Sequence, residues 1–201
     1  MIALSGLLLV LFLVAHLAGV SLSLVDPAAF EAYAATLHRQ EWLPLAEGAL
    51  AAAALTHPLL SIHRSLANRR ARGPVAGPMR SRRQGPAGEV AALAAGAIPW
   101  TGTLLLGFLA VHLAQLRWQR PPAGQEMEAV MTALSSPWSL ALYVLAGGAL
   151  ALHLFHGNES AHRSLGFLNA SNGPRIRQLG RALALVLGGG FILVPLALRL
   201  G

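Results

Sequence analysis

The sequence contains no cysteine and little charge. The absence of cysteine excludes a disulfide scaffold, a thiolate metal site and a cysteine-ligated iron–sulfur cluster within the chain. Charged residues make up 11% of the 201 residues, whereas a soluble domain carries about 25%. Apolar residues make up 55%. A water-soluble surface cannot be built from this composition, which is typical of a protein that crosses a membrane several times.

Five apolar stretches are long enough to cross a bilayer, whose hydrocarbon core of about 30 Å needs roughly 20 helical residues. They lie at 2–25, 43–63, 90–116, 138–157 and 180–200. The first stretch has no basic residues before it and no small-residue cleavage site after it, so we interpret it as a retained span rather than a signal peptide. The sequence therefore predicts an all-α membrane protein, a five-helix bundle that forms one domain over 1–201.

Lysine is absent as well, and all 15 basic residues are arginine. Most of them lie in the connections after the second and fourth spans: Arg64, Arg69, Arg70, Arg72, Arg80, Arg82 and Arg83, then Arg163, Arg175, Arg177 and Arg181. By the positive-inside rule, these connections are cytoplasmic, so the N-terminus is predicted in the cytoplasm and the C-terminus outside. The net charge of +7 is thus interpreted as an orientation signal, and no nucleic-acid partner is expected. The amphipathic connections 26–42 and 120–138 are expected along the external interface.

An internal repeat relates the first two spans to the next two. SGLLLVLFLVAHLA at 5–18 aligns without a gap with TGTLLLGFLAVHLA at 101–114. The matched pairs, each 96 residues apart, are Ser5 and Thr101, Gly6 and Gly102, Phe12 and Phe108, His16 and His112, Trp42 and Trp138, and His57 and His153. We therefore expect 1–66 and 97–162 to be copies of one two-helix unit, with a fifth helix over 180–200 that has no counterpart.

Each of the first four spans contains one histidine that the repeat matches, and these four histidines point to ligand binding. A polar side chain is costly inside a span, and a lone histidine there is most often a hydrogen-bonded packing residue. Two imidazoles on facing helices can instead supply both axial ligands of a six-coordinate haem. By depth, His16 should pair with His112 near the external side, and His57 with His153 near the cytoplasmic side. This predicts two stacked bis-histidine haems.

The surroundings of these histidines leave alternatives open. His156 follows His153 by three residues and could replace it by helical spacing, but only His153 obeys the repeat. Arg64 and Arg163 are candidates for haem propionates or plain cytoplasmic anchors. Small residues such as Gly19 and Gly147 would admit either a macrocycle or a neighbouring helix. A haem-free transporter with a histidine path is a rival interpretation.

Four segments together resemble the dihaem cytochrome b membrane anchor of succinate:quinone oxidoreductases, that is, of succinate dehydrogenases and fumarate reductases. They are SGLLLVLFLVAHLAG, the stretch from His57 to NRRAR, TGTLLLGFLAVHLAQLRW and LHLFHGNESAHRSLG. The resemblance covers nearly the whole chain and implies a multi-pass protein of a prokaryotic cytoplasmic membrane. It implies a distal haem b on His16 and His112 and a proximal haem b on His57 and His153. Ser5, Thr101, Arg64 and Arg163 are expected in the haem surroundings.

The resemblance also implies partners and a task. The chain would hold a flavoprotein subunit and an iron–sulfur subunit and pass electrons between the latter and a membrane quinone, menaquinone or ubiquinone. It would carry no dicarboxylate site itself, and it leaves open a higher oligomer of the complex. Glu31, with Tyr33 and His38 nearby, is the expected quinone site. Some menaquinol-dependent members have a glutamate where this chain has Ala151, which puts a proton route there in doubt.

A different quinone-linked anchor, such as that of a hydrogenase or formate dehydrogenase, is the second redox interpretation. Those families space their histidines otherwise, and the repeat favours the first interpretation.

Overall fold

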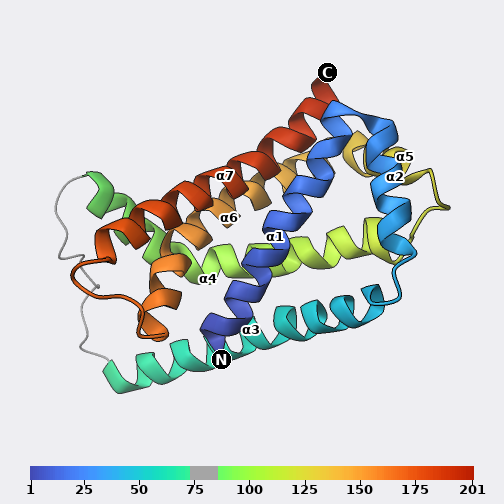
Figure 1. Ribbon diagram of the computed structural model, residues 1–201. Coiled ribbons are helices and arrows are strands. Elements are labelled where there is room, and N and C mark those ends of the chain that lie inside the picture. The colour runs from blue at the N-terminus through green and yellow to red at the C-terminus, as the bar shows by residue number, and fades with distance from the viewer. Residues whose placement is uncertain (73–85) are drawn as a thin grey trace.

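The computed structural model describes residues 1–72 and 86–201, which form helices and connections without a strand (Figure 1). The helices are α1 (Ile2–Val25), α2 (Pro27–His38), α3 (Leu43–Arg72), α4 (Pro86–His112), the π-helix η1 (Leu113–Arg117), α5 (Glu126–Ser135), α6 (Pro137–Ser164) and α7 (Gly173–Leu200). Of the predicted cytoplasmic arginines, Arg80, Arg82 and Arg83 lie outside the described residues.

Within residues 1–72 and 86–201, five helices are long and apolar enough to cross a membrane, so the predicted number of spans is confirmed. They are Ile2–Val25, Leu43–Asn68, Gly88–Arg117, Pro137–Ser164 and Gly173–Leu200. Helices of this length and composition indicate a multi-pass membrane protein. Helices α3, α6 and α7 extend beyond the predicted spans where arginine is frequent, because arginine favours a helix and needs no apolar surroundings once the chain has left the hydrocarbon.

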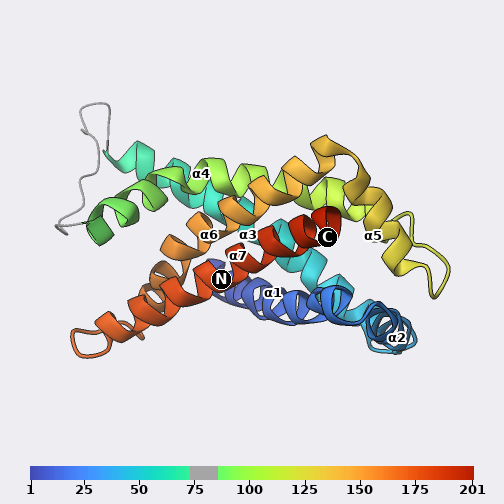
Figure 2. The ribbon, with the colours of Figure 1, turned by 90° about the horizontal axis from the view of Figure 1, so that it is seen from above.

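The core lies where α6 packs against α7 (Figure 2). Leu150 and Leu154 of α6 meet Ala184 and Leu187 of α7, and side chains of α1 and α4 cover them. Glycines bring the two backbones together: a Cβ at Gly188 would lie 2.5 Å from the Cβ of Ala151.

Gly147 belongs to the same crossing between α6 and α7. A Cβ at Gly147 would lie 2.7 Å from Cγ1 of Ile192 and 3.0 Å from the carbonyl oxygen of Gly188. The sequence left open whether Gly147 admits a macrocycle or a neighbouring helix, and in the described residues it lies against the neighbouring helix α7.

The two copies of the repeat form two packed helix pairs. Helix α1 packs on α3, and α4 packs on α6. Within the described residues, α3 has no comparable contact with α4 or α6, and α1 has none with α4. Figure 1 shows α3 spaced apart from α4 accordingly. The backbones that carry the four repeat histidines are therefore not packed directly on those of the other copy, except where α1 meets α6.

The helix ends are defined by local signals. Asp26 caps α2 by accepting hydrogen bonds from the N–H groups of Ala28 (2.9 Å) and Ala29 (3.2 Å), and proline follows at the first helical position. Helix α6 ends at Ser164, and Gly166, two residues later, has φ +77°. The Phe167 N–H donates to the His162 carbonyl over 3.0 Å, as is common at the end of a helix. Helices α2 and α5 lie together at one end of the bundle, and the α6–α7 connection lies at the other (Figure 1).

Candidate functional site

The four repeat histidines meet in two pairs. The ring centroids of His16 (α1) and His112 (α4) lie 5.9 Å apart, with the ring planes at 76°. Those of His57 (α3) and His153 (α6) lie 6.3 Å apart, with the planes at 62°. These are the partners expected from depth. His156 makes no ring contact with His57 in the described part of the chain.

The spacing of each pair fits a shared metal ion. A metal bound to one nitrogen of each ring at about 2.0 Å sets the two ring centres roughly 6 Å apart, close to both observed distances. Among the described residues, no group of three or more His, Asp or Glu side chains could hold a metal ion. Two protein ligands are too few for a bare ion but are the complete axial set of a haem iron, because the macrocycle supplies the other four nitrogens.

Hydroxyl groups hold the rings of His57 and His153, which we call the hydroxyl-bonded pair. Ser5 Oγ lies 3.2 Å from Nδ1 of His57, and Thr101 Oγ1 lies 3.2 Å from Nδ1 of His153. Ser5 and Thr101 are repeat partners, so the same contact occurs once in each copy. Both residues were expected in the haem surroundings, and the structure places each against a histidine.

The carbonyls around these hydroxyls define the direction of the hydrogen bonds. Ser5 lies 3.0 Å from the carbonyl oxygen of Ile2, and Thr101 lies 3.0 Å from that of Ala97. A carbonyl can only accept, and a hydroxyl that donates its single proton there can in turn accept a hydrogen bond from an N–H at the histidine Nδ1. Nδ1 of His57 also lies 3.2 Å from the Ile2 oxygen, and this contact is a hydrogen bond when Nδ1 carries the proton. Nε2 then carries the lone pair that a metal needs.

A glycine beside each hydroxyl makes room for the ring. A Cβ at Gly6 would lie 3.1 Å from Cε1 of His57, and a Cβ at Gly102 would lie 3.5 Å from Cε1 of His153. The sequence alignment matched these two glycines without assigning them a role. Their repetition at the same offset was the signal that could have shown them as part of the histidine seat.

Phenylalanines stack on His16 and His112, which we call the stacked pair. The ring of Phe12 lies 5.2 Å from that of His16 at 13°, and the ring of Phe108 lies 5.4 Å from that of His112 at 27°. Phe191 of α7 adds a third aromatic ring, 5.8 Å from His16. These rings surround the pair with apolar surface, and two of them were already visible as repeat partners.

A short polar chain fixes the ring of His112. Its Nδ1 lies 3.1 Å from the hydroxyl of Tyr143, which donates over 3.1 Å to Oε1 of Gln115; the Gln115 amide donates to Ser139 Oγ over 3.1 Å. With the phenol proton donated to Gln115, the phenol oxygen can accept from an N–H at Nδ1 of His112, and in that tautomer Nε2 carries no proton. Sequence reasoning missed Tyr143 because its repeat counterpart is Glu47.

An apolar groove runs between α1 and α3 beside the stacked pair. It has a volume of about 250 Å³ and is lined by Leu8, Leu11, Phe12, Ala15, Ala46, Ala49 and Leu50. Phe12, which stacks on His16, forms part of its wall.

The predicted propionate partners lie in the C-terminal parts of α3 and α6. Arg64 is exposed. Arg163 is exposed too, and its guanidinium lies 2.8 Å from a carboxylate oxygen of Glu159. Arg163 thus has a carboxylate partner within its own helix, whereas the described residues give the Arg64 guanidinium no such ion pair.

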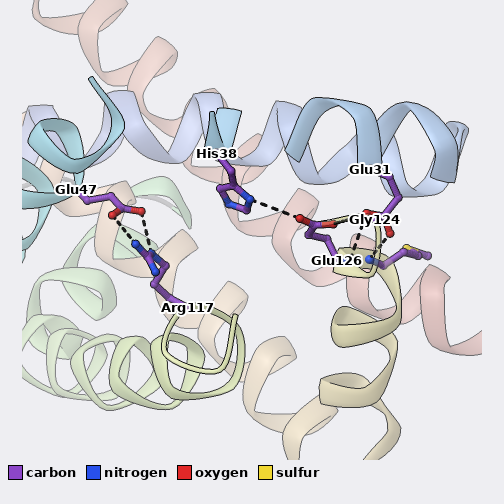
Figure 3. Close-up of polar contacts among 7 residues, drawn as sticks. Glu31, His38, Glu47, Arg117, Gly124 and Glu126 are labelled. Atoms are coloured by element: carbon purple, nitrogen blue, oxygen red, sulfur yellow. Dashed lines mark hydrogen bonds and ion pairs between the residues drawn. The ribbon is translucent and has the colours of Figure 1, made fainter. Parts of the chain in front are cut away.

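The three residues expected to bind quinone belong to α2, at the α2/α5 end. Figure 3 shows the partners of two of them, Glu31 and His38. The Glu31 carboxylate accepts hydrogen bonds from the N–H groups of Glu126 (3.2 Å) and Met127 (2.7 Å), the first residues of α5. Glu31 therefore caps α5 from the neighbouring helix. Tyr33 does not join this cluster, because its ring lies against Gly19 of α1.

Glu126 is the most buried member of this cluster, with 7% of its surface exposed. One carboxylate oxygen accepts from the Gly124 N–H over 2.8 Å, and the other lies 3.4 Å from Nδ1 of His38 without a hydrogen-bond partner in the described residues. Burial raises the pKa of Glu126, but contacts with Glu31, backbone N–H groups and His38 outweigh it, so this pKa lies below its ordinary value. Burial, followed by the charge of Arg120, lowers the pKa of His38.

A paired arginine joins the two copies of the repeat near this cluster (Figure 3). The guanidinium of Arg117 donates to both carboxylate oxygens of Glu47, over 2.8 and 2.7 Å. Such a two-point contact fixes orientation as well as charge, so it holds the start of α3 against η1.

The chain was compared with protein-family models, with curated proteins and with solved structures, and none of them matches it.

Proposed function

We propose that the chain is a dihaem cytochrome b that anchors a succinate:quinone oxidoreductase in the membrane and carries its electrons. The observation that carries this proposal is that two pairs of histidines face each other across helices. In each pair the rings are spaced as two ligands of one iron would be, and no third protein ligand is near among the described residues. Each bound haem b would supply single-electron transfer between the iron–sulfur subunit and membrane quinone.

The side chains around the histidines have separate roles in this proposal. Hydrogen bonds at Nδ1 hold the rings of His57, His153 and His112 in the tautomer with a free Nε2. The phenylalanines of the stacked pair exclude water from that site. In the described residues α3 is not packed directly on α6, so the two backbones leave room at the inner site for a flat macrocycle.

The proposed orientation of the chain implies where its partners would bind. With the N-terminus in the cytoplasm of a prokaryotic cell, the arginine-bearing ends of α3 and α6 face the flavoprotein and iron–sulfur subunits. Arg64 is then available to bind a propionate or a partner subunit, whereas Arg163 already forms an ion pair with Glu159. The hydroxyl-bonded pair becomes the inner, proximal site and the stacked pair the outer, distal site.

Quinone is proposed to react at the α2/α5 end, near the stacked pair. There, His38 and Glu126 are the candidate proton acceptors, because the Glu31 carboxylate is committed to the start of α5. The position of Ala151 supports the absence of a carboxylate route through α6, since its Cβ faces Gly188 at the closest approach of two helices. No carboxylate can be placed there without moving α7.

The test is the haem content of the purified chain, measured by reduced-minus-oxidised spectra and a pyridine haemochrome assay. We expect two b haems per chain. His57→Ala and His153→Ala should each remove one haem, and His156→Ala, a histidine of the same helix as His153, should leave both. A chain without haem would refute the proposal and favour the transporter, which predicts substrate flux and no visible absorption. Loss of a haem in His156→Ala but not in His153→Ala would overturn the ligand assignment.

A further inference from the structure

The hydroxyls of Ser5 and Thr101 differ from other hydroxyls in the same helices. Ser21 of α1 and Thr103 of α4 also donate to carbonyls one turn earlier, Leu17 and Pro99, over 2.7 and 2.8 Å. Neither of these touches a histidine in the described residues. Among the described serine and threonine residues of α1 and α4, only Ser5 and Thr101 also bring the hydroxyl oxygen to an imidazole nitrogen of the opposite helix in their own copy.

We infer that Ser5 and Thr101 are positioning residues that select the Nδ1–H tautomer of His57 and His153 and thereby make Nε2 the ligand atom. This inference rests on the proposed haem function for its consequence, but the tautomer itself is a property of the chain alone. An acceptor at Nδ1 does more than orient the ring. It draws the Nδ1 proton and increases the basicity of Nε2, which favours the oxidised form of a bound iron.

The two histidines depend on their hydroxyls to different degrees. Nδ1 of His57 has a second acceptor, the carbonyl oxygen of Ile2, at 3.2 Å. Nδ1 of His153 has Thr101 as its only partner in the described part of the chain. Removing the hydroxyl of Ser5 therefore leaves His57 with one acceptor, whereas removing that of Thr101 leaves His153 with none.

Shape favours Thr101 as the site to change. Thr101 is 7% exposed, so its side chain is enclosed by neighbours. Valine has nearly the same shape and lacks only the hydroxyl, so Thr101→Val removes the acceptor with little change in packing. Thr101→Ser keeps the hydroxyl and loses a methyl group. Thr103→Val is the matched control, because it removes an exposed hydroxyl two residues further along the same helix.

The first experiment needs no haem. Histidine ¹⁵N spectra of the haem-free chain, assigned through single His→Gln variants, report which ring nitrogen carries the proton. We expect His153 to be the Nδ1–H tautomer in the parent chain, in Thr103→Val and in Thr101→Ser, and a mixture of both tautomers in Thr101→Val. For Ser5→Ala, His57 should keep its tautomer because Ile2 remains. An unchanged tautomer of His153 in Thr101→Val would overturn the inference.

The second experiment uses the haem-loaded chain and measures the midpoint potentials of both haems. Thr101→Val should raise the potential of one haem and leave the other unchanged, Ser5→Ala should produce a smaller shift of the same haem, and Thr103→Val should shift neither. Thr101→Ser should restore the parent potential. If Thr101→Ser behaves like Thr101→Val, the hydroxyl is not the cause and the inference is wrong. Absence of haem from the parent chain refutes the proposed function instead, and leaves the tautomer result standing.

Discussion

Replacing Glu31 with glutamine tests the contact that joins α2 to α5. The carboxylate accepts two N–H groups at the start of α5, at 3.2 and 2.7 Å. A glutamine of the same length offers one carbonyl oxygen, so one hydrogen bond and the negative charge are lost. A hydrogen bond to a charged group contributes about 1.5–3 kcal/mol, and a charge at a helix N-terminus about 0.3–1 kcal/mol. Because Glu31 is partly exposed, solvent screening reduces the expected total to about 1–2 kcal/mol.

This loss should appear in the hydrogen exchange of the Met127 amide. A cost of about 1–2 kcal/mol corresponds to exchange about 5- to 30-fold faster, if the amide exchanges through local opening of α5. Glu128→Gln is the control, since it removes an exposed carboxylate from the same turn of α5 that caps no helix among the described residues. If exchange at Met127 is the same in Glu31→Gln as in Glu128→Gln, Glu31 does not cap α5. Quinone turnover of the assembled complex is measured alongside; a slowed rate with unchanged exchange would assign Glu31 to the quinone instead.

The remaining predictions concern close packing and pH. Gly188→Ala should destabilise the bundle by about 1–3 kcal/mol in denaturant unfolding, because its Cβ would overlap α6. A Cβ at Gly189 would meet no described atom within 4 Å, so Gly189→Ala should stabilise α7 slightly. Equal effects of the two substitutions would contradict the described crossing of α6 and α7. Gly6→Ala should change the spectrum of the haem proposed on His57 and His153 more than Gly102→Ala does. The new Cβ at Gly6 would lie 3.1 Å from Cε1 of His57, whereas that at Gly102 would lie 3.5 Å from Cε1 of His153. The reverse order would contradict the proposed role of these glycines in making room for the rings. The pKa of Glu126 lies below its ordinary value of 4.5, so its stabilising contribution is complete above that pH and is lost as the pH falls through the lowered pKa. The pKa of His38 is also lowered, so folding is favoured above its ordinary value of 6.5, and this contribution to stability is lost as the pH falls below 6.5 toward the lowered pKa. Exchange at Met127, corrected for intrinsic rates, should therefore accelerate on acidification, and protection that grows with acid would refute the assignment.

The spans and the histidine partners could be predicted because their signals are local or periodic. Apolar stretches mark the spans, and the repeat with the depth of each histidine indicated which helices face each other. The contact of Glu31 with α5 could not be predicted, since it joins residues 95 and 96 positions apart and depends on how α2 and α5 fold over the bundle. The same holds for Tyr143, which has no repeat partner of its kind, and for the π-helix η1, which follows His112 without a sequence signal of its own.

The pairing of the histidines has a consequence for how such a chain can arise. His16 meets its own repeat counterpart, His112, and His57 meets His153, so every pair consists of the same position taken from each copy. A symmetric homodimer of a single two-helix unit, with one histidine per helix, would form both pairs from one short gene product. Once two such units are joined in one chain, corresponding positions of the two copies can carry different residues. Position 47 could then carry a glutamate that binds Arg117, while its counterpart, position 143, carries the tyrosine that holds His112.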